Sequence, residues 1–399
     1  MLTPKQMEKY AEVLLWGLAT SRPKPYARHD TVLIQYDLPG LKLVETLYGK
    51  LMDMGVNVVA RLASTARMEL DFYVKADEQQ LTFIPPGTGE LFDNLHGAIY
   101  ILAPESLTHL RDVDPKRIAQ HAVARKPFRD ILVKREERGD FGWTLCVYPT
   151  EEYARCAGLS KRDFTDQIVK ACFLRAASPV KEWTRIFHEA TEIKNWLNSL
   201  KVQAFHVESA NVDLTVTPGQ SRRWKGISGH NIPSFELFLS PDWRGTEGRY
   251  YADQPSYRSG NLVKGVRLEF HKGEVVKVSA DEGEEFVKKQ VAMDKGSNKL
   301  GEFSLTDKRF SKIDRFMANT LFDENFGGAH GNCHVALGSS YSDTFDGDPA
   351  TLTETSKAEL GFNDSALHWD LVNTESKRVT ARLTGGESLV VYEDGQFKI

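Results

Sequence analysis

The sequence has few cysteines and no long apolar run. It contains four cysteines among 399 residues, and no two of them form a CxxC pair. This excludes a disulfide framework and favours a reducing, cytoplasmic compartment. No apolar run approaches 18 residues, so no transmembrane helix is expected. The first 21 residues carry Lys5, Glu8, Lys9 and Glu12, so we do not expect this segment to be the apolar region of a secretory signal.

Several catalytic and binding motifs are also missing. There is no HExxH, which excludes the thermolysin-like mechanism, and no GxSxG, which weakens a serine-hydrolase interpretation. Neither GxGxxG nor GxxxxGK[ST] occurs in the first half, so nucleotide binding has no motif behind it. The formal net charge of −4 is close to neutral for this length. It therefore gives no reason to expect nucleic acid or an anionic membrane as a partner.

What remains is a globular composition on a chain long enough for two domains. Hydrophobic residues make up 41% and charged residues 27%, as in ordinary folded proteins. A chain of 399 residues exceeds the size at which a single core stops growing. We expect an α/β domain with a helical tail over residues 1–185 and a strand-rich domain over residues 186–399.

The first half alternates strand and helix patterns. β-Branched and apolar runs predict strands at Thr31 to Gln35, Val56 to Ala60, Ala98 to Leu102 and Thr144 to Tyr148. Helical spacing predicts helices between them, including one that Thr3 and Pro4 would begin. This order is typical of an α/β domain with a mostly parallel sheet.

The second half changes character after a helix that runs from Pro179 to Leu200. Val212 to Val216 alternates with period two, and residues 265–278 form a hairpin pattern. A second hairpin is predicted to turn at Asp394-Gly395, the strongest short turn signal in the chain. We therefore expect an α+β, strand-rich C-terminal domain with long functional loops.

A dense group of potential metal ligands lies between residues 321 and 334. Asp323, Glu324, His330 and His334 occur within twelve residues of a Gly-rich segment. Carboxylates and imidazoles in such segments are the donors that a divalent metal requires. Cys333 is not expected to be a ligand, because the neighbouring donors are oxygen-rich and suit a harder ion.

Four further residues extend this group. Glu236 and Glu302 each stand where a loop meets an apolar strand, and His368 and Asp370 flank Trp369. The i, i+2 spacing places His368 and Asp370 on one face of a strand. With Glu324 and His334 they make six candidate ligands, enough for two metals that share a bridging carboxylate.

These residues resemble the aminopeptidase T, aminopeptidase S and PepS family of cocatalytic metallopeptidases. The shared features are Asn231-x-Pro-x-x-Glu236, Gly301-Glu302, Asp323-Glu324-Asn325, His334-x-Ala-Leu-Gly338, Tyr341 and His368-x-Asp370. Their order and coarse spacing agree, most specifically over residues 230–372. The chain departs from many members in its longer loop at residues 326–331, which adds His330 either as a support for the ligands or as a residue facing the substrate.

The resemblance implies a metal-dependent aminopeptidase that removes N-terminal residues from peptides by means of two divalent ions. Zinc, cobalt, manganese and magnesium all remain open. The metal ligands would be Glu236, Glu302, Glu324, His334, His368 and Asp370. Either Glu302 or Glu324 would act as the general base, Glu302 being alternatively the bridging ligand. Tyr341 would donate to the developing oxyanion. The resemblance also implies a homodimer.

Two other interpretations use the same residues. A different dinuclear metallohydrolase, such as an amidase or phosphoesterase, would need basic side chains near the ligands, and Arg309 and Arg315 lie between Glu302 and Glu324 in sequence. A metal-stabilised binding protein without enzymatic activity would hold its metal in a closed site. The Gly-rich segment at 327–331 argues against that closed site.

Overall fold

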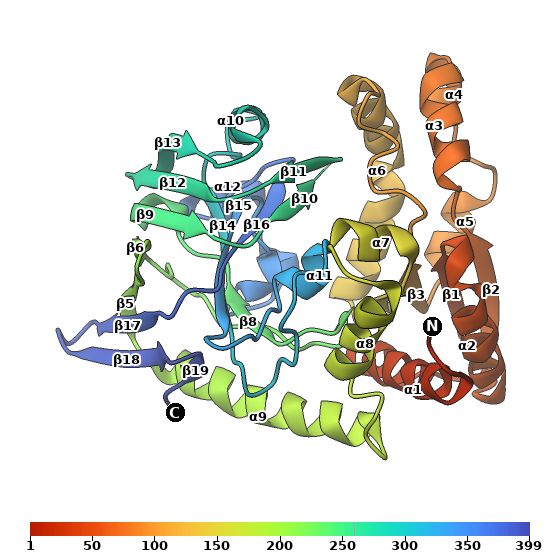
Figure 1. Ribbon diagram of the computed structural model, residues 1–399, viewed down its shortest axis with the longest axis horizontal. Coiled ribbons are helices and arrows are strands. Elements are labelled where there is room, and N and C mark those ends of the chain that lie inside the picture. Colours follow the sequence, from red (N-terminus) through yellow and green to blue (C-terminus); the bar gives the residue numbers. More distant parts are fainter. Residues whose placement is uncertain (259) are drawn as a thin grey trace. The chain divides into compact units, whose positions relative to one another are not determined.

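The computed structural model describes residues 1–258 and 260–399, and they form two compact units (Figure 1). The first comprises Met1–Trp183 and Ser228–Ile232, and the second Thr184–Ile227 and Pro233–Ile399. The domain boundary expected at residues 185/186 stays a prediction. Each unit is described by itself. No helix among the described residues is both long and apolar enough to cross a membrane.

The first unit is built on a five-stranded sheet of order β2-β1-β3-β4-β7, and all neighbouring strands are parallel. The expected α/β layer is therefore confirmed. Apolar side chains bury its middle: Val32, Leu33 and Ile34 on β1 are at most 1% exposed. The strands are β1 Thr31–Tyr36, β2 Asn57–Leu62, β3 Gly97–Leu102, β4 Gly142–Val147 and β7 Asn231–Ile232.

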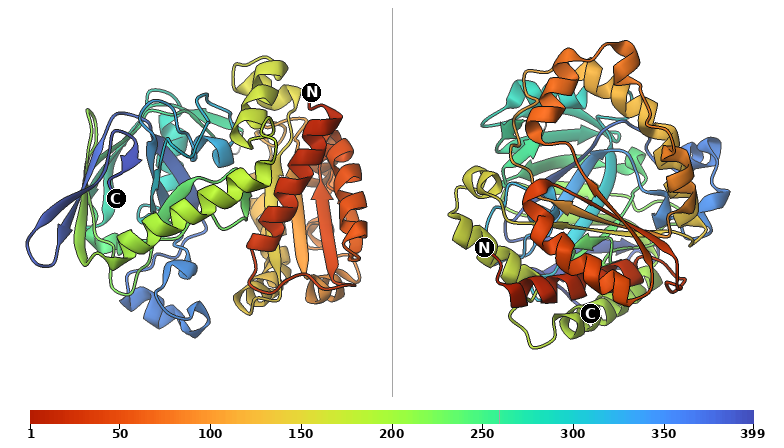
Figure 2. Two further views of the ribbon diagram at one scale, coloured as in Figure 1. Left: turned by 90° about the horizontal axis from the view of Figure 1, so that it is seen from below. Right: turned by 90° about the vertical axis from the view of Figure 1, so that its right-hand side faces the viewer.

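Helices follow most of these strands, as the alternating pattern predicts. Helix α1 packs against β4 and α2, and Figure 2 shows it (red) alongside the sheet. Thr3 and Gln6 begin α1 with a capping box, in which each side chain accepts from the other's backbone N–H. The helical elements are α1 Pro4–Thr20, η1 Leu38–Gly40, α2 Leu41–Asp53, α3 Ala66–Lys75, α4 Glu78–Leu81, α5 Thr88–Asn94, α6 Pro115–Glu137, α7 Glu151–Cys156 and α8 Lys161–Ala171.

The second unit contains two larger antiparallel sheets and a two-stranded one. An eight-stranded sheet has the order β13-β12-β9-β6-β5-β17-β18-β19, and a four-stranded sheet the order β16-β15-β14-β8. The expected strand-rich C-terminal domain is therefore confirmed. The strands are β5 Val202–Glu208, β6 Asp213–Val216, β8 Glu236–Leu239, β9 Glu247–Ala252, β10 Ser256–Arg258, β11 Asn261–Val263, β12 Val266–His271, β13 Glu274–Ser279, β14 Leu300–Thr306, β15 Asn332–Gly338, β16 His368–Asn373, β17 Arg378–Leu383, β18 Ser388–Glu393 and β19 Gln396–Phe397.

Both predicted hairpins form in the eight-stranded sheet: β12 pairs with β13, and β18 with β19. Asp394 and Gly395 have φ values of 53° and 73°, as the two central residues of a type I′ turn require. Short helices lie mainly in the long connections. The helical elements of this region are α9 Pro179–Ser199, η2 Trp243–Gly245, α10 Glu284–Val291, α11 Thr320–Asp323, η3 Ser342–Thr344, η4 Pro349–Thr351 and α12 Glu354–Glu359.

Strand β14 divides an apolar core from a polar face. Phe303 contacts the rings of Phe205 and Trp224, with centroids 5.9 Å away in both cases. Glu302 and Ser304 alternate with Phe303 and therefore point to the opposite face of the sheet. Every residue of β14 is buried, the polar ones included. Buried polar side chains on one face of a central strand need hydrogen-bonding or charged partners. The residues that surround Glu302 and Ser304 on this face therefore form the candidate site.

Candidate metal centre

The register of the four-stranded sheet gathers the predicted ligands on one face. Glu302 on β14 pairs with Ala336 on β15, and Ala336 pairs with Asp370 on β16. Directly paired residues have their side chains on the same face. Glu236 pairs with Thr306, which alternates with Glu302 and so shares that face. Strands spread over residues 236–370 thus contribute side chains to one place.

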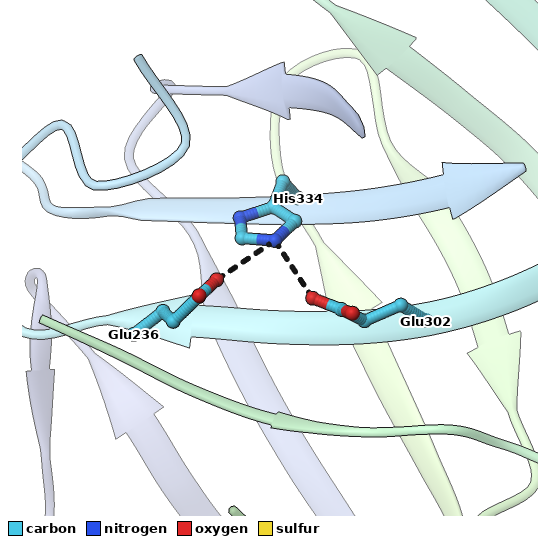
Figure 3. Close-up of side chains that lie close together, drawn as sticks. All are labelled: Glu236, Glu302 and His334. Atoms are coloured by element: carbon cyan, nitrogen blue, oxygen red, sulfur yellow. Dashed lines mark hydrogen bonds and ion pairs between the residues drawn. The ribbon is translucent and has the colours of Figure 1, made fainter. Parts of the chain in front are cut away.

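His334 lies at the middle of this group. Its Nε2 is 3.2 Å from Oε2 of Glu236 and 3.1 Å from Oε1 of Glu302, which approach from two sides (Figure 3). The imidazole is fully buried, and Glu236 and Glu302 are 8% and 3% exposed. The three residues present ligand atoms within 4.8 Å of one another, which is a spacing that one metal ion can bridge.

His368 and Asp370 complete the group from β16. Nε2 of His368 is 3.5 Å from Oδ1 of Asp370 and 3.8 Å from Oε2 of Glu302. Its Nδ1 lies 2.8 Å from the carbonyl oxygen of Ser339 and donates to it. In the neutral imidazole this contact fixes the tautomer whose Nε2 lone pair faces the carboxylates, an arrangement typical of histidine ligands.

Small residues make room between the ligands. Ala336 lies between Glu302 and Asp370 in the ladder, so only a methyl group occupies the floor of the site. The β14–β15 register shifts between Leu300 and Glu302, which is a β-bulge at Gly301. A Cβ there would lie 2.4 Å from the carbonyl oxygens of Gly338 and Ser339. The glycine is therefore needed for the bulge that aims Glu302.

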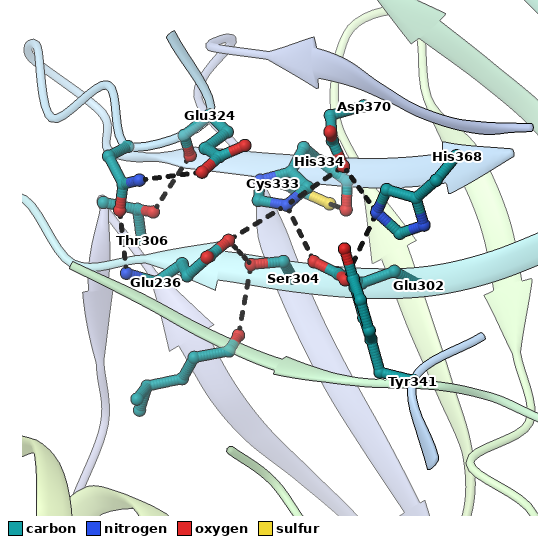
Figure 4. Close-up of polar contacts among 12 residues, drawn as sticks. Glu236, Glu302, Ser304, Thr306, Glu324, Cys333, His334, Tyr341, His368 and Asp370 are labelled. Atoms are coloured by element: carbon teal, nitrogen blue, oxygen red, sulfur yellow. Dashed lines mark hydrogen bonds and ion pairs between the residues drawn. The ribbon is translucent and has the colours of Figure 1, made fainter. Parts of the chain in front are cut away.

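Glu324 and Tyr341 border this group (Figure 4). Glu324 follows α11 and is 8% exposed, and its Oε1 accepts from Nδ2 of Asn325 at 3.3 Å. Tyr341 is 46% exposed, but its ring lies 4.7 Å from that of His368, and its hydroxyl points toward Glu302 and His368. Of the three predicted catalytic side chains, Glu302 therefore belongs to the five closely placed residues, and Glu324 and Tyr341 lie beside them.

Burial and mutual charge shift the protonation of the group strongly. Burial raises the pKa of Glu302 to about 7, with His334 opposing the shift and Glu236 adding to it. Burial lowers the pKa of His368, but the charge of Asp370 outweighs it and the pKa rises to about 9. Burial and the charges of Glu236 and Asp370 raise the pKa of Glu324. Protons would thus compete with a metal ion for these carboxylates, and the carboxylates raise one another's pKa by mutual repulsion.

Other residues of the 321–334 segment do not join the group. The buried carboxylate of Asp323 accepts from the backbone N–H groups of Met317 and Asn319 at 2.7 and 2.9 Å, which organises the loop before α11. His330 is exposed. Cys333 lies on the apolar face of β15, because it alternates with His334. Burial raises the pKa of its thiol to about 11.

Three residues support the proposed ligands in ways that the sequence did not predict, although Asn325 belongs to the Asp323-Glu324-Asn325 motif. Ser304 donates to Oε2 of Glu236 at 3.4 Å, Ser339 accepts from His368, and Asn325 donates to Glu324. Ser304 stands two residues after Glu302 and shares its strand face, so the spacing could have indicated it. The role of the Ser339 backbone could not be read from side-chain identity.

The donor set fits a divalent metal ion. Carboxylate oxygens and imidazole nitrogens are hard to borderline ligands. Without a cation, burying several carboxylates together is costly, since each loses its hydration. The members of the set are Glu236, Glu302, Glu324, His334, His368 and Asp370.

Comparisons with known proteins agree with this chemistry. A model of the thermophilic metalloprotease (M29) family matches residues 3–397. Aminopeptidase PepS of Streptococcus thermophilus is 24% identical over 418 residues, covering 99% of this chain and 98% of that protein. Aminopeptidase 2 of Geobacillus stearothermophilus is 28% identical over 393 residues, covering 92% and 91%.

The solved structure of wild-type AmpT from Thermus thermophilus has the same fold, with a TM-score of 0.82, 21% identity and coverage of 100% of both chains. The resemblance inferred from the residues is confirmed, and so is the predicted fold class. The chain belongs to the thermophilic metalloprotease (M29) family and is a metal-dependent peptidase.

Proposed function

We propose that this chain is an aminopeptidase that removes N-terminal residues from peptides, with two divalent metal ions held by Glu236, Glu302, Glu324, His334, His368 and Asp370. The names of the relatives, aminopeptidase PepS and aminopeptidase 2, support the choice of activity. The convergence of buried carboxylates and imidazoles on one sheet face is the observation that carries the proposal.

Charge supports two ions rather than one. The six proposed ligands include four carboxylates and two imidazoles. With the imidazoles neutral, as metal binding requires, two divalent cations would balance the four carboxylate charges, whereas one would leave two negative charges uncompensated. Because uncompensated buried charge is costly, a dinuclear site is the better match. The native metal stays open among zinc, cobalt, manganese and magnesium.

Glu302 is the proposed bridging ligand, since its two oxygens face His334 and His368 respectively. Glu324 is the proposed general base and would be only loosely bound to the ions: it borders the group, and burial raises the pKa of its carboxyl, which favours uptake of a proton. Tyr341 would donate its phenolic hydrogen to the developing oxyanion. When bound, the ions supply Lewis acidity and lower the pKa of a water molecule.

The phosphoesterase alternative relied on Arg309 and Arg315 as basic residues near the ligands, and neither side chain supports it. Arg309 is engaged by Asp307, with Nη2–Oδ2 and Nε–Oδ1 distances of 2.6 and 2.9 Å. Arg315 is exposed. Neither guanidinium contacts the ligand group, so a phosphate would find no clamp from them.

Metal analysis of the wild type beside Glu302→Ala and His368→Ala tests the proposal, with hydrolysis of leucine p-nitroanilide measured on each. Both variants should lose metal and activity together, because each removes a donor from the buried group. His330→Ala is the matched control, since His330 is an exposed histidine of the same region. Wild-type metal content and full activity in both ligand variants would refute the site. Preference for p-nitrophenyl phosphate would favour the phosphoesterase.

We also propose a cytoplasmic homodimer. The dimer rests on the family resemblance, and the compartment on the four cysteines, all of which are free thiols. Light scattering should give about twice the 45.0 kDa mass of one chain. A monomer mass at micromolar concentration would contradict the dimer.

A further inference from the structure

We infer that Asn325 is a positioning residue for the metal centre: its side-chain amide sets the carboxylate of Glu324 and the backbone of Glu236 at a fixed separation. This inference rests on the proposed function, because it matters only if both glutamates serve the metals. Asn325 itself is fully buried and is not one of the proposed ligands.

The amide of Asn325 makes four hydrogen bonds. Its Oδ1 accepts from the backbone N–H groups of Phe235 at 2.5 Å and Glu236 at 3.0 Å. Its Nδ2 donates to the carbonyl oxygen of Leu321 at 2.9 Å and to Oε1 of Glu324 at 3.3 Å. Two donors face one end of the amide and two acceptors face the other. The orientation of the amide is therefore dictated by its neighbours, since the reverse one would oppose like groups.

The backbone around Asn325 is held independently of this amide. Ser311 donates to the carbonyl oxygen of Asn325 at 2.5 Å, and Asn332 donates to those of Glu324 and Phe326 at 3.0 and 2.7 Å. The chain path therefore has its own anchors. The Asn325 side chain adds the link from this segment to a carboxylate and across to the start of β8, which carries another proposed ligand.

This arrangement explains why an amide is required at this position. A carboxylate in its place could still accept from the two N–H groups but would repel Glu324 and the carbonyl oxygen of Leu321. An aliphatic side chain would leave two buried N–H donors and a buried carboxylate without these partners. Residues that orient metal ligands in this way commonly change metal affinity by 10–100-fold when substituted.

The test compares Asn325→Asp with Asn373→Asp. Both asparagines are fully buried, and both donate through Nδ2 to a backbone carbonyl and to a carboxylate, but the carboxylate beside Asn373 is that of Glu375, which is not a proposed ligand. Cobalt affinity is measured by chelator competition and the site geometry by visible absorption of the cobalt protein. Asn325→Asp should weaken the affinity about tenfold or more, equivalent to about 1.4 kcal/mol, and alter the spectrum. Asn373→Asp should keep the affinity within about twofold and leave the spectrum unchanged, because its amide holds no proposed ligand.

A reversed pair tests the contact without metal. In Glu324→Gln/Asn325→Asp, a glutamine amide can donate to the new carboxylate, so the double variant should recover thermal stability that Asn325→Asp alone loses. This arm remains informative if Asn325→Asp fails to fold, since the double variant should then fold. Absence of recovery, or equal losses of cobalt affinity in the Asn325 and Asn373 variants, would overturn the inference. A wild type that binds none of zinc, cobalt, manganese and magnesium would instead refute the proposed function.

Discussion

The parallel sheet of the first unit and the four-stranded sheet of the second unit differ in the kinds of side chain that they bury. The parallel sheet of the first unit buries Val32, Leu33 and Ile34 in consecutive positions, as expected where both faces are covered. The four-stranded sheet of the second unit also buries Glu236, Glu302 and His334, which are at most 8% exposed. Apolar burial stabilises a fold by itself, whereas buried charge needs a partner. The parallel sheet therefore acts as a structural scaffold, whereas the four-stranded sheet carries the candidate metal site.

Polar groups of the first unit show the contrast at close range. At the carboxyl end of its sheet, Asp37 accepts from the backbone N–H of Ala103 at 2.7 Å, and Glu69 lies 2.8 Å from Nε2 of His109. Each of these acids thus has a local donor. In the second unit the carboxylates face one another around two imidazoles. A cluster of acidic residues at a sheet therefore indicates a metal site only when the neighbouring residues do not supply enough hydrogen-bond donors or cations for the carboxylates.

The largest expected effect on activity comes from exchanging a carboxylate of the metal site for an amide, and the same exchange in the first unit serves as the control. Glu236→Gln should lower peptidase activity about 1000-fold, equivalent to roughly 4 kcal/mol of barrier, because a neutral amide is a poor metal ligand. Asp37→Asn should leave metal content and activity at the wild-type level, since its oxygen can still accept from Ala103. Metal analysis and kinetics on both variants decide the matter. Equal losses in the two would remove the distinction between the sheets.

Filling the floor of the site is the next largest change. Ala336→Leu places a branched side chain between Glu302 and Asp370 and should weaken metal binding about 100-fold. Ala98→Leu in the first unit adds the same volume to a fully buried position. Both substitutions should cost about 1–3 kcal/mol of stability through overpacking, but only the first should affect metal affinity. Unaltered affinity in Ala336→Leu would contradict the assigned floor.

Removal of metal should loosen one unit selectively. Chelation leaves the buried carboxylates without counter-ions, so hydrogen exchange should accelerate in β8, β14, β15 and β16 while the parallel sheet stays protected. Exchange followed by mass spectrometry resolves the two units peptide by peptide. Uniform acceleration throughout the chain would show that the metal stabilises both units alike.

The metal-free protein should lose stability as pH rises. The pKa of His368 is raised to about 9 in the folded chain, against about 6.5 in an unfolded chain. The folded state therefore binds more protons between these values, and the contribution of His368 to stability is full below about pH 6.5 and lost as pH rises through about 9. Thermal unfolding at pH 6 and pH 9 measures the effect, which His368→Ala should diminish.

The smallest effect is expected at the first helix. Thr3→Ala removes the capping box of α1 and should lower stability by about 1 kcal/mol, without changing metal content or activity. Chemical denaturation measures the loss of stability, and metal analysis checks that the metal content is unchanged. A loss of metal in this variant would link the helix to the site in a way that its local contacts do not indicate.

Much of the fold could be predicted because its signals are local. The strands and helices of the first unit, the turn at Asp394-Gly395 and the same-face spacing of His368 and Asp370 all follow from periodicity and turn chemistry. The sequence also supplied the six proposed ligands through a resemblance whose family is confirmed. Their assignment as ligands stays a prediction until metal binding is measured.

The sequence by itself determined which donors exist, the fold class and the family. Only the tertiary structure decided which donors meet. The pairing of β8, β14, β15 and β16 brings side chains from four distant segments to one face and leaves His330 exposed and Asp323 bound to its own loop. Side-chain type is a property of each residue, but strand register is a property of the whole sheet, and a register shift of one residue would turn these side chains to the other face.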